Sequence, residues 1–247
     1  MAVRELPFLR LDLNVQEDFF LPGAPLYVAN AEAVRGRLRE LARAWGGKES
    51  AALPTLALLD AHASDDAEFT GGALPPHALA GAPGARMLAE LRERGAAVIP
   101  ASGRRSPWPD LDRLRLEGGR LILEKRAHDG FSNPALAEVL RHWRPRELAL
   151  CGAVLEQDLR ATALTARPLG FEVVVLEDAA GRRDAAAAVK VRGELERRGV
   201  RFETTTAVIK RLFEWRARQD RREREHRSGR KAAPAAPGGA SGPETGR

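Results

Sequence analysis

The chain has 247 residues, of which 44% are hydrophobic and 30% are charged, a balance that excludes a wholly disordered protein. No apolar run reaches the roughly 18 residues that a membrane span requires, and the amino terminus lacks a secretory-signal pattern, so we expect a cytoplasmic protein without membrane contact. The formal net charge is +6, and the single cysteine, Cys151, excludes an intramolecular disulfide and a cysteine-based zinc cluster.

Apolar segments of strand length alternate with stretches of helical spacing along most of the chain. The predicted strands cover residues 8–13, 55–59, 97–100, 120–123, 147–151 and 171–176. The predicted helices cover residues 30–44, 85–94, 133–142, 156–169, 184–198 and 206–226, with Asn30 and Asn133 as N-caps. This alternation predicts parallel strands joined by crossover helices, and consecutive apolar residues such as LALL and VVVL indicate strands covered on both faces. We therefore predict an α/β fold, a three-layer α/β/α sandwich with a parallel sheet.

The carboxyl-terminal region differs from the rest in charge and composition. We divide the chain into a domain at 1–208, a basic helix at 209–227 and a flexible tail at 228–247, which is rich in Gly, Ala and Pro and poor in large apolar residues. From Lys210 to Lys231 there are ten basic and four acidic residues, so this segment holds the whole positive excess. We favour a helix with solvated charges, because four acids interrupt the run; the alternative is a basic arm that contacts nucleic acid. In the favoured interpretation, the apolar residues that dock on the sheet are Ile209, Leu212, Phe213 and Trp215.

Polar side chains gather just past the carboxyl ends of the predicted strands. In open parallel sheets ligands bind outside these ends, because the connecting loops leave a crevice there. The residues to inspect are Asn14, Gln16, Asp60, His62, Lys125, Glu156 and Asp158.

At these residues the sequence resembles the nicotinamidase and isochorismatase-like cysteine hydrolase family. The segments that carry the likeness are LDLNVQEDFFLPGAPLYV, LLDAHASDDAEF, PPHALAGAPGA, EKRAHDGFSNPALAEVL and GAVLEQDLRATALTARPLGFEVVVLEDAAG. They occur in the family's order, each at a strand end, and extend from about Phe8 to about Thr206. The resemblance implies the isochorismatase-like hydrolase fold.

The resemblance also implies a catalytic site in which two of three residues have changed. The family works with an Asp-Lys-Cys triad; here those positions are occupied by Asn14, Lys125 and Asp158. Cys151 lies seven residues before Asp158, inside an apolar strand, where a cysteine is usually inert. Asp12 does not compensate for Asn14, since relatives carry an acidic residue there too. The chain is therefore expected not to run the thiol reaction.

A second set of motifs resembles the metal site of nicotinamidase-like members. Asp60-Ala-His62 and Pro76-His77 match the family's metal ligands, and these residue types suit Zn²⁺ or another divalent first-row ion. The surroundings depart from the family pattern at Ala78 and at Gly81-Ala-Pro-Gly84. No Walker or dinucleotide motif indicates a nucleotide cofactor.

Two functions remain open on the sequence. The first is a hydrolase-family protein without cysteine-hydrolase activity, which binds a small carbonyl or amide ligand with Gln16, Phe19 and Glu156 in the pocket. The second is a metal-dependent amide hydrolase, with Asp158 as general base for a water and Lys125 stabilising the oxyanion. We favour the first, because a lost nucleophile more often means lost chemistry than new chemistry. Homo-oligomers are common in the family, but no residue here fixes that state.

Overall fold

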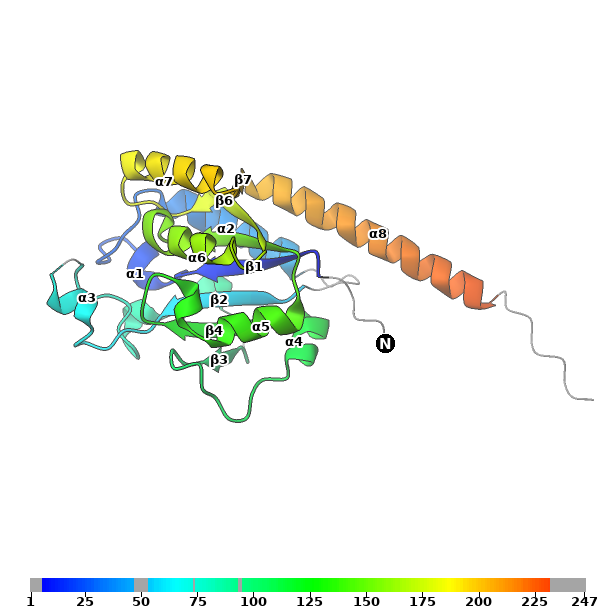
Figure 1. Cartoon of the computed structure of the whole chain (residues 1–247), viewed down its shortest axis with the longest axis horizontal. Helices are drawn as coiled ribbons and strands as arrows, with labels where there is room; N and C mark the ends of the chain where they lie inside the picture. The colour runs from blue at the N-terminus through cyan, green and yellow to red at the C-terminus, as the bar shows by residue number, and fades with distance from the viewer. Residues whose placement is uncertain (1–5, 47–52, 73, 93–94, 232–247) are drawn as a thin grey trace, which may run out of the picture. The chain divides into compact units, whose positions relative to one another are not determined.

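The computed structural model describes residues 6–46, 53–72, 74–92 and 95–231, and it divides the chain into two units, 1–210 and 211–247. In the described residues the first unit is built on a parallel sheet of seven strands in the order β3-β4-β2-β1-β5-β6-β7 (Figure 1). The strands are β1 (Phe8–Leu13), β2 (Thr55–Asp60), β3 (Ala97–Ile99), β4 (Arg120–Lys125), β5 (Glu147–Gly152), β6 (Glu172–Ala180) and β7 (Arg201–Glu203). Six of them were predicted; the short edge strand β7 was not.

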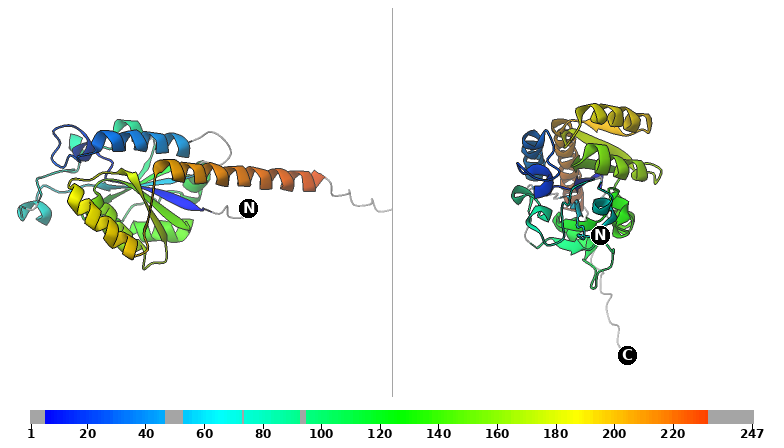
Figure 2. Two further views of the ribbon diagram at one scale, coloured as in Figure 1. Left: turned by 90° about the horizontal axis from the view of Figure 1, so that it is seen from above. Right: turned by 90° about the vertical axis from the view of Figure 1, so that its left-hand side faces the viewer.

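Helices cover both faces of this sheet, with α2 over one face and α5 and α6 over the other (Figure 2). The α-helices are α1 (Glu17–Phe20), α2 (Ala31–Trp45), α3 (Ala67–Thr70), α4 (Leu111–Glu117), α5 (Ala135–Trp143), α6 (Arg160–Ala166), α7 (Ala185–Arg197) and α8 (Thr205–Lys231). Shorter turns are η1 (Pro83–Ala85), η2 (Ala89–Leu91), η3 (Gly130–Ser132) and the π-helical turn η4 (Leu155–Leu159). Every residue of β1, β2 and β5 is buried, as expected for strands between two helical layers. The predicted three-layer α/β/α fold is confirmed.

The helix predicted over residues 85–94 is wrong in its described part. Residues 85–92 form only the end of η1 and the turn η2, separated by extended backbone at Arg86 and non-helical backbone at Leu88. The carbonyl of Arg86 accepts from the Glu17 amide at 2.9 Å, and the Leu88 amide donates to the Val15 carbonyl at 2.9 Å. Because these backbone groups pair with the segment after β1, they are not available for helical hydrogen bonds.

The predicted caps had different outcomes. Asn30 precedes α2, but its side chain does not cap that helix: Nδ2 donates to the Ala180 carbonyl at 3.0 Å, and Oδ1 accepts from the Arg182 amide at 2.9 Å. Asn133 does accept from the Ala135 amide, at 2.9 Å, where α5 begins. At Asn30, hydrogen bonds to the end of β6 and the segment after it thus take the place of the predicted N-cap hydrogen bond.

Helix α8 runs from the first unit into the second and ends at Lys231, later than the predicted end near 226. Of the flexible tail predicted at 228–247, residues 228–231 belong to α8 and residues 232–247 lie outside the described residues. No helix in the part of the chain that the structure describes is both long and apolar enough to cross a membrane.

Two backbone features bring the ends of β1 and β5 close together. Gly152 ends β5 with a φ of 108°, and a Cβ there would lie 1.9 Å from the Leu13 carbonyl oxygen, so a side chain has no room. Asn14 follows β1 with a φ of 44°, and its amide donates to the Leu58 carbonyl at 2.9 Å. This close approach places the residues after β1, β2, β4 and β5 at one edge of the sheet.

Candidate metal and active site

The three residues expected at catalytic positions lie together in the structure. Lys125 ends β4, Asn14 follows β1, and Asp158 lies in the turn η4 after β5. Lys125 Nζ is 2.7 Å from Asp158 Oδ1, and Asn14 Nδ2 donates to the same oxygen at 2.9 Å. The Val154 amide contacts the other carboxylate oxygen at 3.3 Å. All three predicted side chains are buried, so Asp158 is a fully hydrogen-bonded interior carboxylate.

Asp60, at the end of β2, joins this cluster to the predicted metal ligands. Asn14 Nδ2 donates to Asp60 Oδ2 at 2.8 Å, and Lys125 Nζ contacts Asp60 Oδ1. Burial would raise the pKa of Asp60, but the Lys125 ammonium and His62 lower it to about 2. Burial would likewise lower the pKa of Lys125, but Asp158 and Asp60 hold it above its usual range. The cluster therefore has two carboxylates against one ammonium, an excess of negative charge inside the protein.

Asp60, His62 and His77 form a cluster of metal-ligand type. Each offers one ligand atom, these atoms all lie within 4.8 Å of one another, and all three residues are buried. The Nε2 atoms of His62 and His77 lie 3.8 and 3.9 Å from Asp60 Oδ2. His62 Nδ1 is 2.9 Å from Asp66 Oδ2, and His77 Nδ1 is 2.9 Å from the Pro75 carbonyl, so protonated Nδ1 atoms leave both Nε2 lone pairs for an ion. The donor set, its supporting contacts and the negative excess fit a divalent cation.

Comparison with known families settles the fold family. The model of the isochorismatase domain matches residues 11–207 of this chain. The chain belongs to the isochorismatase family. The predicted resemblance is thereby confirmed.

Solved structures with this family's fold superpose over most of the chain. An isochorismatase-like hydrolase from Alkaliphilus metalliredigens is 22% identical, with a TM-score of 0.66 over 82% of this chain and 97% of that one. A pyrazinamidase of Pyrococcus horikoshii in complex with zinc is 24% identical, with a TM-score of 0.64 over 80% of this chain and 99% of that one. The streptothricin hydrolase of Streptomyces noursei is 32% identical over 113 residues, which is 41% of this chain and 41% of that enzyme. The match thus spans about two-fifths of that relative's length.

Asp66, which contacts His62 Nδ1, was not among the residues predicted for this isochorismatase-family site. The change Asp66→Ala should lower zinc affinity about 10- to 100-fold, since loss of a carboxylate that orients a histidine ligand typically costs that much. Zinc titration against a competing chelator measures it. The matched control is Asp65→Ala, which removes the exposed neighbouring carboxylate. Equal affinities for the two variants would contradict the role given to Asp66.

Two further ionisable residues of this site were also missed. His128, in the loop after β4, has Nδ1 at 3.6 Å from Asp158 Oδ1 and Nε2 at 3.9 Å from Glu68 Oε1. Glu68 Oε2 lies 3.7 Å from His62 Nε2. Asp158 raises the pKa of His128, whose side chain is 41% exposed and so links the buried cluster to solvent. Glu68 belongs to the motif LLDAHASDDAEF, where its position six residues after His62 was the available signal.

The residues expected to bind substrate have structural contacts. Gln16 Nε2 donates to the carbonyls of Asp60 and Ala85, both at 2.8 Å, and its Oε1 accepts from the Asp60 amide at 3.0 Å. Phe19 is buried, with its ring edge-on to His77 at 5.6 Å between centroids. Glu156 Oε1 accepts from the Arg183 and Asp184 amides just before α7, at 3.1 and 2.9 Å. Their contact with a ligand stays a prediction.

Cys151 lies in a separate buried cluster. Its Sγ is 3.2 Å from Asp12 Oδ1, and Asp12 in turn pairs with Arg10 and Arg120. Burial and the Asp12 carboxylate raise the pKa of the Cys151 thiol well above its usual value. A thiol held protonated is a poor nucleophile, so the structure supports the expectation that Cys151 is inert. Asp12 is likewise committed to two guanidinium groups and does not contact Asn14 or Lys125 in the hydrogen bonds of the described residues.

Proposed function

We propose that this protein holds a divalent metal ion with Asp60, His62 and His77 and binds a small carbonyl or amide ligand beside it, without running the family's thiol-dependent hydrolysis. The observation that carries the proposal is the contact between Lys125 and Asp158, in which a carboxylate lies next to the lysine where the family resemblance implies a thiol. A carboxylate that attacked an amide would have to form an anhydride, which is much less stable than the amide it replaces. Asp158 therefore serves better as an anchor for Lys125 than as a nucleophile.

An amide ligand would satisfy one polar atom of the buried cluster. Asn14 Oδ1 is buried and accepts no hydrogen bond within the described residues, while Asn14 Nδ2 is fully used. A buried acceptor without a partner costs free energy, and an amide N–H of a ligand would supply one. The metal, when bound, would polarise the ligand's carbonyl oxygen as a Lewis acid. The name of the Pyrococcus relative, a pyrazinamidase, supports an aromatic amide as the ligand class.

Metal content of the purified protein tests the first half of the proposal. The chain should bind one equivalent of zinc, and His77→Ala should weaken that binding by more than the roughly 10- to 100-fold cost of losing a supporting residue. The control is His142→Ala, because His142 pairs with Asp112 on the surface. Elemental analysis and chelator competition give the readout. A chain that binds no zinc, or two variants that bind it alike, would contradict the assignment.

Hydrolysis assays test the claim that the protein does not run the thiol-dependent reaction. Alkylation of the chain should leave the rate of nicotinamide or pyrazinamide hydrolysis unchanged, because no thiol takes part. Hydrolysis that a thiol reagent abolished through Cys151 would contradict the proposal.

Metal-dependent amide hydrolysis is the second candidate, and the position of His128 favours it. His128 lies beside Asp158 and is part-exposed, so the pair has the composition of an acid–base dyad that can exchange protons with solvent. In this alternative Asp158 acts as general base or orients His128, and Lys125 stabilises the oxyanion. Release of ammonia that requires zinc or manganese and disappears in Asp158→Ala would establish this candidate over the first; no release above that variant would exclude it.

A further inference from the structure

The second unit contains a helix segment with no apolar face. After Trp215, residues 216–231 of α8 include no Val, Ile, Leu, Met, Phe, Tyr or Trp. A helix that is polar all round gains nothing from burial against a protein core, and it lacks the apolar side with which amphipathic helices enter a membrane surface. Any partner that binds this segment would therefore contact it through polar or charged groups.

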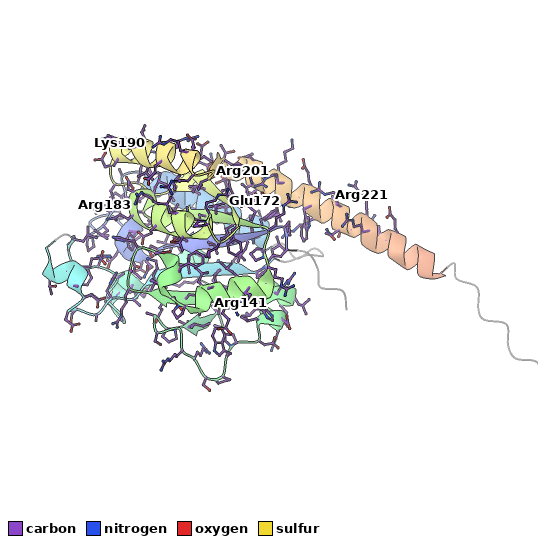
Figure 3. All side chains as sticks on the ribbon, in the orientation of Figure 1. Arg141, Glu172, Arg183, Lys190, Arg201 and Arg221 are labelled. Carbon is purple, nitrogen blue, oxygen red and sulfur yellow. The ribbon has the colours of Figure 1, made fainter. Side chains whose placement is uncertain are left out.

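The segment is strongly positive, and its basic positions are distributed around the helix axis. Residues 217–231 include seven basic and three acidic residues, a net of four positive charges. Successive residues of an α-helix turn by about 100°, so positions 218, 221, 222, 224, 227, 230 and 231 fall on all sides of the axis. Arg218, Arg221 and Arg222 are exposed, and Figure 3 shows Arg221 on α8.

Two of the three acidic residues of the segment stand at positions that stabilise the helix, and the segment keeps its net positive charge. Asp220 precedes Arg224 by four residues and Glu223 precedes Arg227 by four, the spacing and order that stabilise an isolated helix by about 0.2–0.5 kcal/mol per pair. A preformed helix loses less conformational entropy on binding. The interrupting acids are thus compatible with a binding arm.

We propose that α8 binds double-stranded DNA, with residues 217–231 lying in the major groove as a basic helix. The major groove is about 12 Å wide and admits one α-helix, which then has phosphates on both sides. Basic positions distributed around the helix axis in the sequence match that arrangement, whereas a flat anionic surface would contact only one side. The deep and narrow major groove of duplex RNA does not admit the helix.

Fluorescence anisotropy with a labelled 30-base-pair DNA duplex tests the proposal on the full chain. Replacing Arg218, Arg221, Arg222 and Arg224 by Gln should weaken binding at least about 100-fold at low salt and reduce the slope of log K against log salt by about 0.9 per lost phosphate contact. The matched control replaces four basic residues of the first unit by Gln, so that both variants change from a formal net charge of +6 to about +2. These residues are Arg141, Arg183, Lys190 and Arg197, all exposed and the first three labelled in Figure 3.

The control variant should bind DNA within about threefold of the unchanged chain, because its arm is intact. Absence of DNA binding by the full chain would overturn the proposal. So would equal losses in the two variants, since net charge rather than α8 would then govern binding. Equal or tighter binding to duplex RNA or to vesicles of anionic lipid would overturn the assignment to DNA.

Discussion

A chain carrying Asn14→Asp and Asp158→Cys together should hydrolyse aromatic amides on the order of 10³-fold or more above the unmodified chain, because loss of a nucleophile or its partner typically costs at least that. The two changes restore the Asp-Lys-Cys set that the family resemblance implies. Lys125 already lies 2.7 Å from Asp158, so an introduced thiol would lie beside an ammonium that stabilises its thiolate. Ammonia release from nicotinamide and pyrazinamide measures the gain.

The charge of the cluster explains why the two changes belong together. In the unmodified chain two carboxylates, Asp158 and Asp60, surround Lys125. The double variant also has two, because the carboxylate lost at position 158 is replaced by the one gained at position 14. Asn14→Asp alone would place three carboxylates around one ammonium and should destabilise the fold, since buried like charges repel. We expect the double variant to be more stable than this single variant.

Alkylation supplies a second readout for the double variant. The introduced thiol should react with iodoacetamide at pH 7, whereas Cys151 should not, because burial raises its pKa. Because both thiols are buried, the comparison is between them: a folded double variant in which the introduced thiol reacts only at a pH as high as Cys151 requires would contradict the placement of position 158 beside Lys125. A reactive thiol without amide hydrolysis would instead contradict amides as the ligand class.

Lys125→Met should lower the free energy of unfolding by about 3–5 kcal/mol, the usual cost of removing one member of a buried ion pair. The substitution keeps most of the side-chain volume but leaves Asp60 and Asp158 without their shared cation. Urea unfolding of the zinc-free protein measures the loss. The double change Lys125→Met and Asp158→Asn should recover part of it, because one uncompensated charge is removed.

The control for this prediction is Lys190→Met, which removes an exposed lysine of α7. Substitutions at exposed positions usually change stability by less than about 0.5 kcal/mol. Similar losses for Lys125→Met and Lys190→Met would show that the buried cluster contributes little, and the electrostatic account of the site would then fail.

Local sequence patterns predicted the fold because the apolar composition of a strand reflects how much of that strand is buried. The apolar runs of β1, β2 and β5 are buried at every position, so their composition alone indicated strands between two helical layers. The wrong helix prediction at residues 85–94 arose because long-range contacts, not local pattern, decide the structure there. That segment has helical spacing, yet its backbone pairs with residues 15–17, about 70 positions earlier in the chain, and no local pattern contains that information.

The site divides in the same way. The sequence by itself determined which residues follow the strand ends, among them Asn14, Asp60, His62, Lys125 and Asp158, and the resemblance at Pro76-His77 added His77. These side chains were expected in two groups, the catalytic positions and the metal-ligand positions. Only the tertiary structure decided that Asp60 belongs to both groups, that Asp66 orients His62, and that His128 reaches Asp158. The physical reason is that strand periodicity fixes where a side chain points, whereas the distance between loops that follow different strands depends on strand order, register and the close approach at Gly152.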